Sequence, residues 1–395
     1  MIIRNGKVFM EDFQFHPGNV LVQGERIAAV SGSGKPEGEK AENSSHEVSL
    51  DAKGCLVLPG LVDIHLHGCA GCDFCDGEPE SIAKIAEREA LWGVTSLCAT
   101  TMTVPEERLL QAARAVKTYD RNWREKEPER WRRGSHILGI HMEGPFIARE
   151  KKGAQKEEDI QLPRASLIYK MQETSGGRVK LLTFAPELPG AEQMIRKLGE
   201  AIVLSVGHTG ADYDTALNAM RLGVKHVTHL YNAMTPYEHR APGVVGAAAD
   251  MPETAVELIA DGLHIHPSVI RSTYRMFGEQ RVILISDSMR AAGMPDGVSE
   301  LGGQSVYIHG KKATLADGTL AGSVTNLYDC VRYCIKEIGI PVESAVRSAT
   351  SNPARAIGAD REVGSIAKGK YADLLLVDEK TLELEQVILR GRILG

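Results

Sequence analysis

The chain has 395 residues, of which 43% are hydrophobic and 25% are charged, proportions that are ordinary for a globular protein. This length allows one large domain with a smaller one beside it. The formal net charge of -6 argues against a nucleic-acid-binding protein, which usually carries a basic stripe, and it means that an anionic substrate needs a local cationic pocket.

The sequence lacks the features of a secreted or membrane-bound protein. No apolar run approaches the roughly 20 residues that a membrane helix needs, and no secretory signal is visible at the amino terminus. The seven cysteines are an odd number in a large chain, which suits free thiols in a reducing compartment. We therefore expect a cytoplasmic protein that binds neither nucleic acid nor a membrane.

Short apolar segments separated by Gly, Asn and charged turns occur at both ends of the chain, within residues 1–53 and 362–395. Such segments are typical of short β-strands. They predict one small β-sandwich domain built from both termini. The stretch from Ser31 to Ser45 is rich in Gly, Ser and Glu, and we expect it to be a mobile loop.

Residues 54–361 are predicted to form the larger domain. Apolar segments alternate there with helical patterns, which predicts parallel strands with right-handed crossovers. Eight such units over about 240 residues fit a (β/α)8 TIM barrel. The competing fold, a doubly wound open sheet, would favour a G-x-G-x-x-G turn after the first strand, and none is present. The eight segments are residues 55–65, 94–102, 136–143, 179–186, 201–208, 226–232, 254–261 and 281–288.

His65 and His67 close the first of these segments. Residues two apart point to the same side of a strand, so both imidazoles can converge on one metal ion. The alternative is a pair of histidines that only form hydrogen bonds at a loop mouth.

Three cysteines, Cys69, Cys72 and Cys75, follow the histidine pair in a Gly-rich segment. Their spacing resembles half of a zinc-binding arrangement, but no second Cys or His pair follows at a suitable spacing. We therefore expect buried free thiols rather than a structural zinc site.

Residues of metal-ligand type lie at the ends of five predicted strands. The C-terminal face of such a barrel carries the active site, so these residues would share one mouth. Each could instead be a cap or a turn former, but the full set in strand order predicts a metal centre. His and carboxylate ligands together suit zinc or another borderline divalent ion. The set consists of His65, His67, Glu143, His208, His229 and Asp287.

The motifs around these residues resemble the amidohydrolase superfamily over essentially the whole chain. Pro59 to Gly68 is one of these motifs, and the closing segments Ser351 to Arg355 and Gly369 to Leu374 indicate the fold more than the substrate. Two motifs are more specific, His141-Met142-Glu143-Gly144-Pro145 and His229-Leu230-Tyr231-Asn232-Ala233-Met234, and these resemble deacetylases of 6-phosphorylated N-acetylglucosamine. The resemblance implies conversion of N-acetyl-D-glucosamine 6-phosphate into D-glucosamine 6-phosphate and acetate.

The resemblance also implies how metal is bound. Glu143, His208 and His229 would hold a primary divalent ion. His65 and His67 would hold a second ion bridged by Glu143, which takes the place of a modified lysine used elsewhere in the superfamily. One or two ions per subunit are expected, with zinc favoured and iron, manganese or cobalt as alternatives.

Two residues would carry the catalytic chemistry. Asp287 is expected to accept the proton of the attacking water and return it to the departing amine, a double role that one carboxylate can perform. His264 resembles a substrate contact that polarises the carbonyl oxygen. The alternative for His264 is a loop histidine with a purely structural hydrogen bond.

Arg240 matches the phosphate-binding arginine of these deacetylases, and the resemblance implies that the neighbouring subunit of a homodimer supplies it. An arginine suits phosphate because its planar fork forms bidentate hydrogen bonds. Relatives often carry His where Gln155 stands, which leaves the side-chain contact there open. The other implied substrate-binding residues are Ala154, Asn232, Ala233, His264, Leu320, Ala321 and Gly322.

Three other functions compete with this one. The nearest is the same reaction on the galactosamine epimer. A cyclic-amide hydrolase of the same superfamily, such as a dihydroorotase, would more often show the bridging lysine that Glu143 replaces. A non-enzymatic binding protein on a decayed barrel is disfavoured by the intact set of metal-ligand residues.

Overall fold

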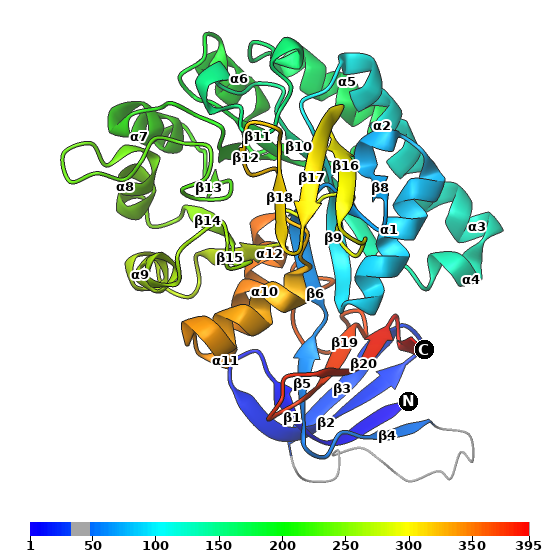
Figure 1. The fold of residues 1–395 in the computed structure, drawn as a ribbon. Coiled ribbons are helices and arrows are strands. Elements are labelled where there is room, and N and C mark those ends of the chain that lie inside the picture. The colour runs from blue at the N-terminus through cyan, green and yellow to red at the C-terminus, as the bar shows by residue number, and fades with distance from the viewer. Residues whose placement is uncertain (33–47, 395) are drawn as a thin grey trace.

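Eight parallel strands form the centre of the larger domain in the computed structural model, which describes residues 1–32 and 48–394. The strands lie side by side in chain order (Figure 1). The first and last are joined where the Asp287 amide donates to the His65 carbonyl at 2.9 Å. The predicted (β/α)8 barrel is therefore confirmed. Its strands are β6 (Leu61–Leu66), β9 (Val94–Thr101), β10 (His136–Glu143), β11 (Val179–Phe184), β12 (Val203–Val206), β13 (His226–Val227), β14 (Ala255–Ile259) and β15 (Val282–Ile285).

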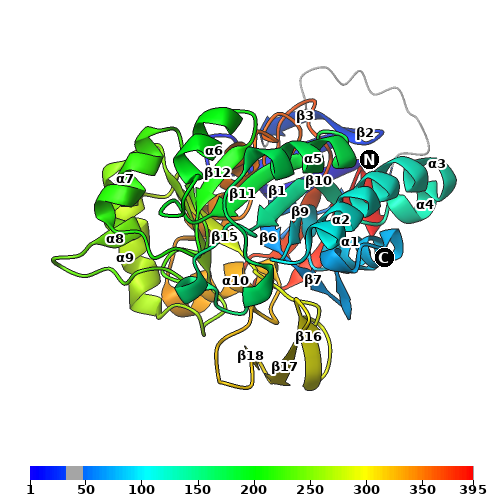
Figure 2. The same cartoon turned by 90° about the horizontal axis from the view of Figure 1, so that it is seen from above.

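Helices surround these strands (Figure 2), because each connection carries one apolar face. In α1 (Pro79–Leu91), buried Ile82, Ile85, Ala86 and Ala90 recur at helical spacing. Such faces pack against the outer side of the barrel in one large apolar core. The other helices are α2 (Glu106–Thr118), α3 (Arg124–Lys126), α4 (Pro128–Trp131), α5 (Ala165–Ser175), α6 (Ala191–Leu198), α7 (Tyr213–Arg221), α8 (Gly243–Asp250), α9 (Pro267–Phe277), α10 (Leu327–Tyr333), α11 (Val342–Ser348) and α12 (Ser351–Ala356).

The single strand expected over residues 55–65 is wrong, because the run divides at Gly60. Residues before it form β5 (Cys55–Pro59), which pairs with β19 (Leu374–Asp378) in the terminal sheet. Residues after it form β6 of the barrel. A Cβ on Gly60 would lie 2.1 Å from Thr95 Oγ1, so only glycine allows this close passage between the two sheets.

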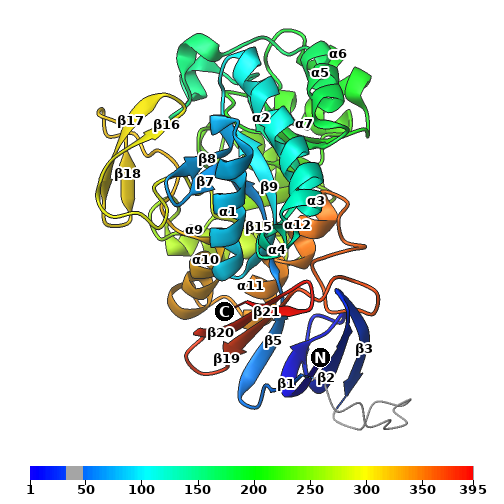
Figure 3. The ribbon, with the colours of Figure 1, turned by 90° about the vertical axis from the view of Figure 1, so that its right-hand side faces the viewer.

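Both termini build one β-rich domain, as predicted (Figure 3). Its strands form one continuous hydrogen-bonded sheet whose apolar side chains gather in a single cluster that includes Val8, Val20, Val57 and Ile388. The expected loop at residues 31–45 lies mostly outside the described residues. The sheet order is β21 (Arg392–Leu394), β20 (Leu384–Leu389), β19, β5, β1 (Ile2–Phe9), β2 (Phe15–Gln23) and β3 (Arg26–Gly32), with β4 (Ser49–Asp51) beside β1.

Two small antiparallel elements follow the first and the last barrel strand. A three-stranded sheet, β16 (Gly297–Leu301), β17 (Gln304–His309) and β18 (Lys312–Thr314), stands between β15 and α10 and is absent from the predicted elements. A hairpin of β7 (Gly68–Cys69) and β8 (Cys72–Asp73) carries the cysteines after the histidine pair. Cys69, Cys72 and Cys75 are free and buried, as expected. None of the described helices has the length and apolar character of a membrane span.

Candidate metal centre

Sharp turns at the ends of three barrel strands direct side chains into the C-terminal mouth. His208, His229 and Asp287 each lie two residues beyond the last residue of their strand. All three have left-handed backbones, with φ of 48°, 28° and 48°. Such a conformation is strained for a residue with a side chain and recurs at functional sites. His65 and Glu143, by contrast, lie within β6 and β10.

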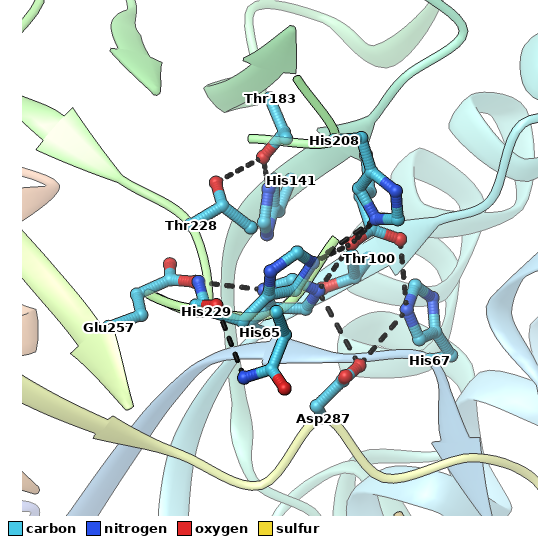
Figure 4. A network of polar contacts seen from close by, with 12 residues as sticks. His65, His67, Thr100, His141, Thr183, His208, Thr228, His229, Glu257 and Asp287 are labelled. Atoms are coloured by element: carbon cyan, nitrogen blue, oxygen red, sulfur yellow. Dashed lines mark hydrogen bonds and ion pairs between the residues drawn. The ribbon is translucent and has the colours of Figure 1, made fainter. Parts of the chain in front are cut away.

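Glu143, His208 and His229 form one group with metal-ligand spacing (Figure 4). Glu143 Oε1 lies 3.1 Å from His208 Nε2 and 3.0 Å from His229 Nε2. The two imidazole nitrogens are 3.1 Å apart. Ligand atoms at about 2.0–2.2 Å from one tetrahedral zinc ion are separated by roughly 3.3 Å. The three side chains therefore fit a shared divalent cation.

His65 and His67 form a second group that shares Glu143. His65 Nε2 lies 3.3 Å from Glu143 Oε1 and 3.6 Å from Asp287 Oδ1. His67 Nε2 lies 3.3 Å from both Glu143 Oε2 and Asp287 Oδ1. His65 Nε2 is buried and has no hydrogen-bond partner among the described residues, which is costly unless another group binds it. A metal ion would supply that partner.

Two of these histidines have a fixed partner at the ring nitrogen that faces away from the centre. His208 Nδ1 donates to the Lys151 carbonyl at 2.8 Å, and His65 Nδ1 donates to Glu257 Oε2 at 2.9 Å. Such partners fix the tautomer, so that Nε2 is available as a ligand. The sequence analysis missed Glu257. A fully buried charge within the apolar strand Ala255–Ile259 was the available signal.

The histidines and carboxylates of the centre alter each other's ionisation. Burial opposes the charge on Glu143, but His208 and His65 hold the pKa of this carboxyl well below its usual range. Burial also lowers the pKa of His67, but Asp287 and Glu143 outweigh it and raise this pKa to about 10. A metal ion bound to His67 would take the place of its proton and would be stabilised by the same two carboxylates. Metal binding would therefore release a proton.

A third group of potential ligands, His65, His141 and Glu257, lies deeper in the barrel and does not fit a metal. His141 Nδ1 donates to the Ile64 carbonyl at 3.1 Å, and His141 Nε2 lies 2.7 Å from the Thr183 hydroxyl. Both ring nitrogens are thus engaged, and Figure 4 shows the contact with Thr183. Burial holds the pKa of His141 well below its ordinary value.

His264 lies at the wall of the mouth and is held by Asp261. Asp261 Oδ2 accepts from His264 Nδ1 at 2.7 Å, and Asp261 Oδ1 accepts from the backbone amides of Leu263 and His264 at 2.9 Å. Burial lowers the pKa of His264, but the hydrogen bond and charge of Asp261 raise it overall. Because its Nδ1 is occupied, His264 presents Nε2 as the free ring nitrogen.

A cavity of about 270 Å³ lies over the two ligand groups. Met102, Ile259 and Leu301 give it an apolar side. Ala321 is fully buried and does not line it. The predicted substrate-binding residues that line this cavity are Ala154, Gln155, Asn232, Ala233, His264, Leu320 and Gly322.

Gln155 also contacts the metal ligands. Its amide nitrogen donates to Glu143 Oε2, and its Oε1 accepts from the Thr103 amide at 2.7 Å. The Thr103 donor fixes which end of the amide faces the carboxylate. Gln155 therefore holds Glu143 in addition to lining the cavity, a contact that the sequence did not indicate.

Arg240 lies apart from this cavity. It is exposed on the loop between β13 and α8 and is not among the lining residues. The structure thus brings the metal-ligand set and most predicted sugar contacts together, and it leaves Arg240 outside the cavity of its own chain.

Comparison with known proteins gives full-length matches. Residues 56–394 match the Amidohydrolase family. The N-acetylglucosamine-6-phosphate deacetylase of Bacillus subtilis (strain 168) is 37% identical over 100% of this chain and 96% of its own. The N-acetylgalactosamine-6-phosphate deacetylase of Escherichia coli O157:H7 is 33% identical over 86% of this chain and 87% of its own. Among solved structures, a mutant N-acetyl-D-glucosamine-6-phosphate deacetylase from Mycobacterium smegmatis, in complex with N-acetyl-D-glucosamine-6-phosphate, has a TM-score of 0.88 and 32% identity, with 100% of this chain and 98% of that chain covered.

Proposed function

The chain belongs to the amidohydrolase family, and from this premise we propose that it hydrolyses N-acetyl-D-glucosamine 6-phosphate to D-glucosamine 6-phosphate and acetate. The observation that carries the proposal is the convergence of Glu143, His208 and His229 at one mouth, in a chain that matches such deacetylases over its whole length.

The ligand groups support a divalent metal cofactor. Glu143, His208 and His229 would hold the primary ion, and His65, His67 and Glu143 would hold a second one. Nitrogen and carboxylate ligands favour zinc, with iron, manganese and cobalt as alternatives. When bound, such an ion supplies a hydroxide nucleophile at neutral pH and polarises the carbonyl that is attacked.

Asp287 is the group proposed to move the proton. Its carboxylate lies at the edge of the cavity, within 3.3 Å of His67 Nε2. It would accept a proton from the attacking water and then donate this proton to the nitrogen of the departing amine. The same carboxylate serves both steps because hydrolysis leaves it unchanged overall.

His264 is proposed to act as an imidazolium, with a proton on each ring nitrogen, and to donate from Nε2 to the acetyl carbonyl oxygen, where negative charge develops. Asp261 supports this role, since it accepts the Nδ1 proton at 2.7 Å and fixes the ring. A donor held in place before the reaction stabilises the transition state without reorganisation. Ala154 would line the sugar, and the backbone of Asn232 and Ala233 would share in binding the phosphate.

The phosphate is proposed to bind Arg240 of a second subunit. The formal net charge of -6 makes a local cation necessary for a dianionic substrate. Arg240 is exposed and outside its own cavity, which is compatible with supply across a homodimer interface. We further propose a cytoplasmic location, in keeping with seven free cysteines.

The galactosamine epimer is the second candidate substrate, because one relative, 33% identical, is an N-acetylgalactosamine-6-phosphate deacetylase. The test is release of acetate from both 6-phosphorylated N-acetyl sugars, with kcat/KM measured for each. We expect the larger value for the glucosamine form. A larger value for the galactosamine form would make that sugar the preferred substrate. If the metal-loaded enzyme released acetate from neither sugar, the deacetylase activity would be refuted.

A further inference from the structure

Glu257 is a buried carboxylate inside the barrel, one layer below the metal centre. In β14 the side chains alternate: Val256 and Leu258 belong to the outer core, whereas Ile259 belongs to the cluster that fills the barrel interior. Glu257 shares the side of Ile259, because residues two apart point the same way. Its side chain is fully buried.

One oxygen of Glu257 contacts two strands that carry metal ligands. Oε2 accepts from His65 Nδ1 at 2.9 Å and from the backbone amide of His229 at 3.1 Å (Figure 4). His65 belongs to the second ligand group and His229 to the first. Glu257 thus connects both groups through a single atom without belonging to either.

No lysine or arginine among residues 1–32 and 48–394 forms an ion pair with Glu257. Its charged contacts are His65 and, at 3.7 Å, His226 Nε2. A buried carboxylate without a fixed cation is unfavourable, and an apolar side chain of similar size would be a better structural choice. The residue is therefore better explained by what it does to His65.

We propose that Glu257 is a positioning residue that makes His65 a metal ligand and couples the two ligand groups. By accepting the Nδ1 proton, it fixes the tautomer in which His65 Nε2 carries the lone pair that faces Glu143 and Asp287. The same oxygen holds the backbone of His229 in its turn. This inference rests on the metal dependence proposed above.

The test is metal binding by metal-depleted protein, measured by titration with Zn²⁺ and by the visible spectrum of the Co²⁺ form. We expect Glu257→Gln to weaken binding at the His65-dependent site by about 10- to 100-fold, as for other partners of metal-bound histidines. Glu89→Gln is the matched control, since Glu89 is also a fully buried glutamate but lies on α1 beside Cys69. It should bind metal as the unmodified protein does.

A second comparison separates positioning from a general structural effect. In the double variant His65→Ala, His67→Ala, the further change Glu257→Gln should cost less metal affinity than it does in the unmodified protein, because only the contact with the His229 amide remains. Equal metal binding by Glu257→Gln and the unmodified protein would overturn the proposal, and so would an additive loss in the triple variant. Acetate release is assayed separately from metal binding. If the unmodified protein released no acetate but Glu257→Gln still weakened metal binding, the proposed function would be refuted and the role of Glu257 would stand.

Discussion

Two regions of this molecule bury histidine beside carboxylate groups. They differ in whether an arginine or lysine lies next to these groups. At the barrel mouth, the described contacts of Glu143 include four histidines and no arginine or lysine. At the junction with the terminal sheet, Asp373 Oδ2 lies 2.9 Å from His136 Nε2, and buried Arg390 lies next to them, with Nη2 3.2 Å from His136 Nδ1.

The difference shows why one cluster can bind a metal and the other cannot. Arg390 also donates to the Gly134 carbonyl at 2.7 Å and stacks over Trp131 at 4.1 Å, so the junction already contains its cation. Burial lowers the pKa of His136, whereas Asp287 and Glu143 raise that of His67 to about 10. A buried acidic cluster whose described charged contacts are all histidines can exchange their protons for a divalent cation.

The largest expected effect is at the mouth. Asp287→Asn should lower kcat by about 10²- to 10⁴-fold, because the variant cannot move the proton. Substrate affinity should change little, as measured by equilibrium binding. Metal content is the control. If the variant keeps more than about a tenth of the original kcat, an effect well below that range, Asp287 is not the proton carrier.

At the junction we expect a loss of stability instead of activity. Arg390→Ala should lower the free energy of unfolding by about 3 kcal/mol or more, since it removes a buried cation whose partners then stay buried. Urea denaturation measures this, and kcat should be nearly unchanged. Arg392→Ala is the matched control, because Arg392 pairs with Glu129 at the surface, where a pair contributes about 0–1 kcal/mol. Equal losses for both variants would contradict this difference between buried and exposed arginines.

No lysine or arginine lines the mouth cavity among the residues that the structure describes, so we expect the substrate phosphate to bind a cation from elsewhere. Arg240→Ala should raise KM for the phosphorylated sugar by about 10- to 100-fold, the size of a lost charged hydrogen bond, with a smaller effect on kcat. Activity on unphosphorylated N-acetylglucosamine should hardly change. Mixing Arg240→Ala with Asp287→Asn subunits should restore part of the activity, because mixed dimers would contain one intact site. No recovery after proven subunit exchange would place Arg240 in its own chain's site.

Glu89 provides a third case, a buried carboxyl with neither a histidine cluster nor an arginine. Burial raises its pKa from 4.5 to about 8, so the folded protein holds a proton that the unfolded chain releases. Stability should therefore fall by up to about 1.4 kcal/mol per pH unit as pH rises from 4.5 towards 8. Glu89→Gln should remove this contribution. Unfolding measured at about pH 5.5 and about pH 7.5, both inside that window, checks it, and identical slopes for both proteins would show that Glu89 is not protonated.

The sequence predicted those parts of the fold that depend on periodicity. All eight barrel strands fall within the predicted segments or overlap them, because buried parallel strands are short apolar runs bounded by turns. The division of residues 55–65 was missed, since Cys55–Pro59 and Leu61–Leu66 are both apolar and only the close approach of Thr95 to Gly60 separates them. The sheet of β16–β18 was missed because its strands are short and largely exposed, although β17 alternates between exposed and buried residues.

At the site, the sequence indicated residues that end strands and missed residues that act through others. The C-terminal face of the barrel explains why Glu143, His208 and Asp287 meet. Glu257 gave only one sign, a charge inside an apolar strand. No sequence pattern indicated the contact of Gln155 with Glu143, because Gln155 lies on a loop and loop conformation does not follow from periodicity.

The passage of the chain through Gly60 also bears on the order in which the protein can form during synthesis. Residues 55–59 are made before the barrel, but their partner on one side is residues 374–378, which are made after it. Closing such a long segment is favourable only after the intervening barrel is compact. The terminal sheet can then be completed only after β19 has left the ribosome. A truncated chain would leave β5 as an exposed apolar edge, which is a template for aggregation.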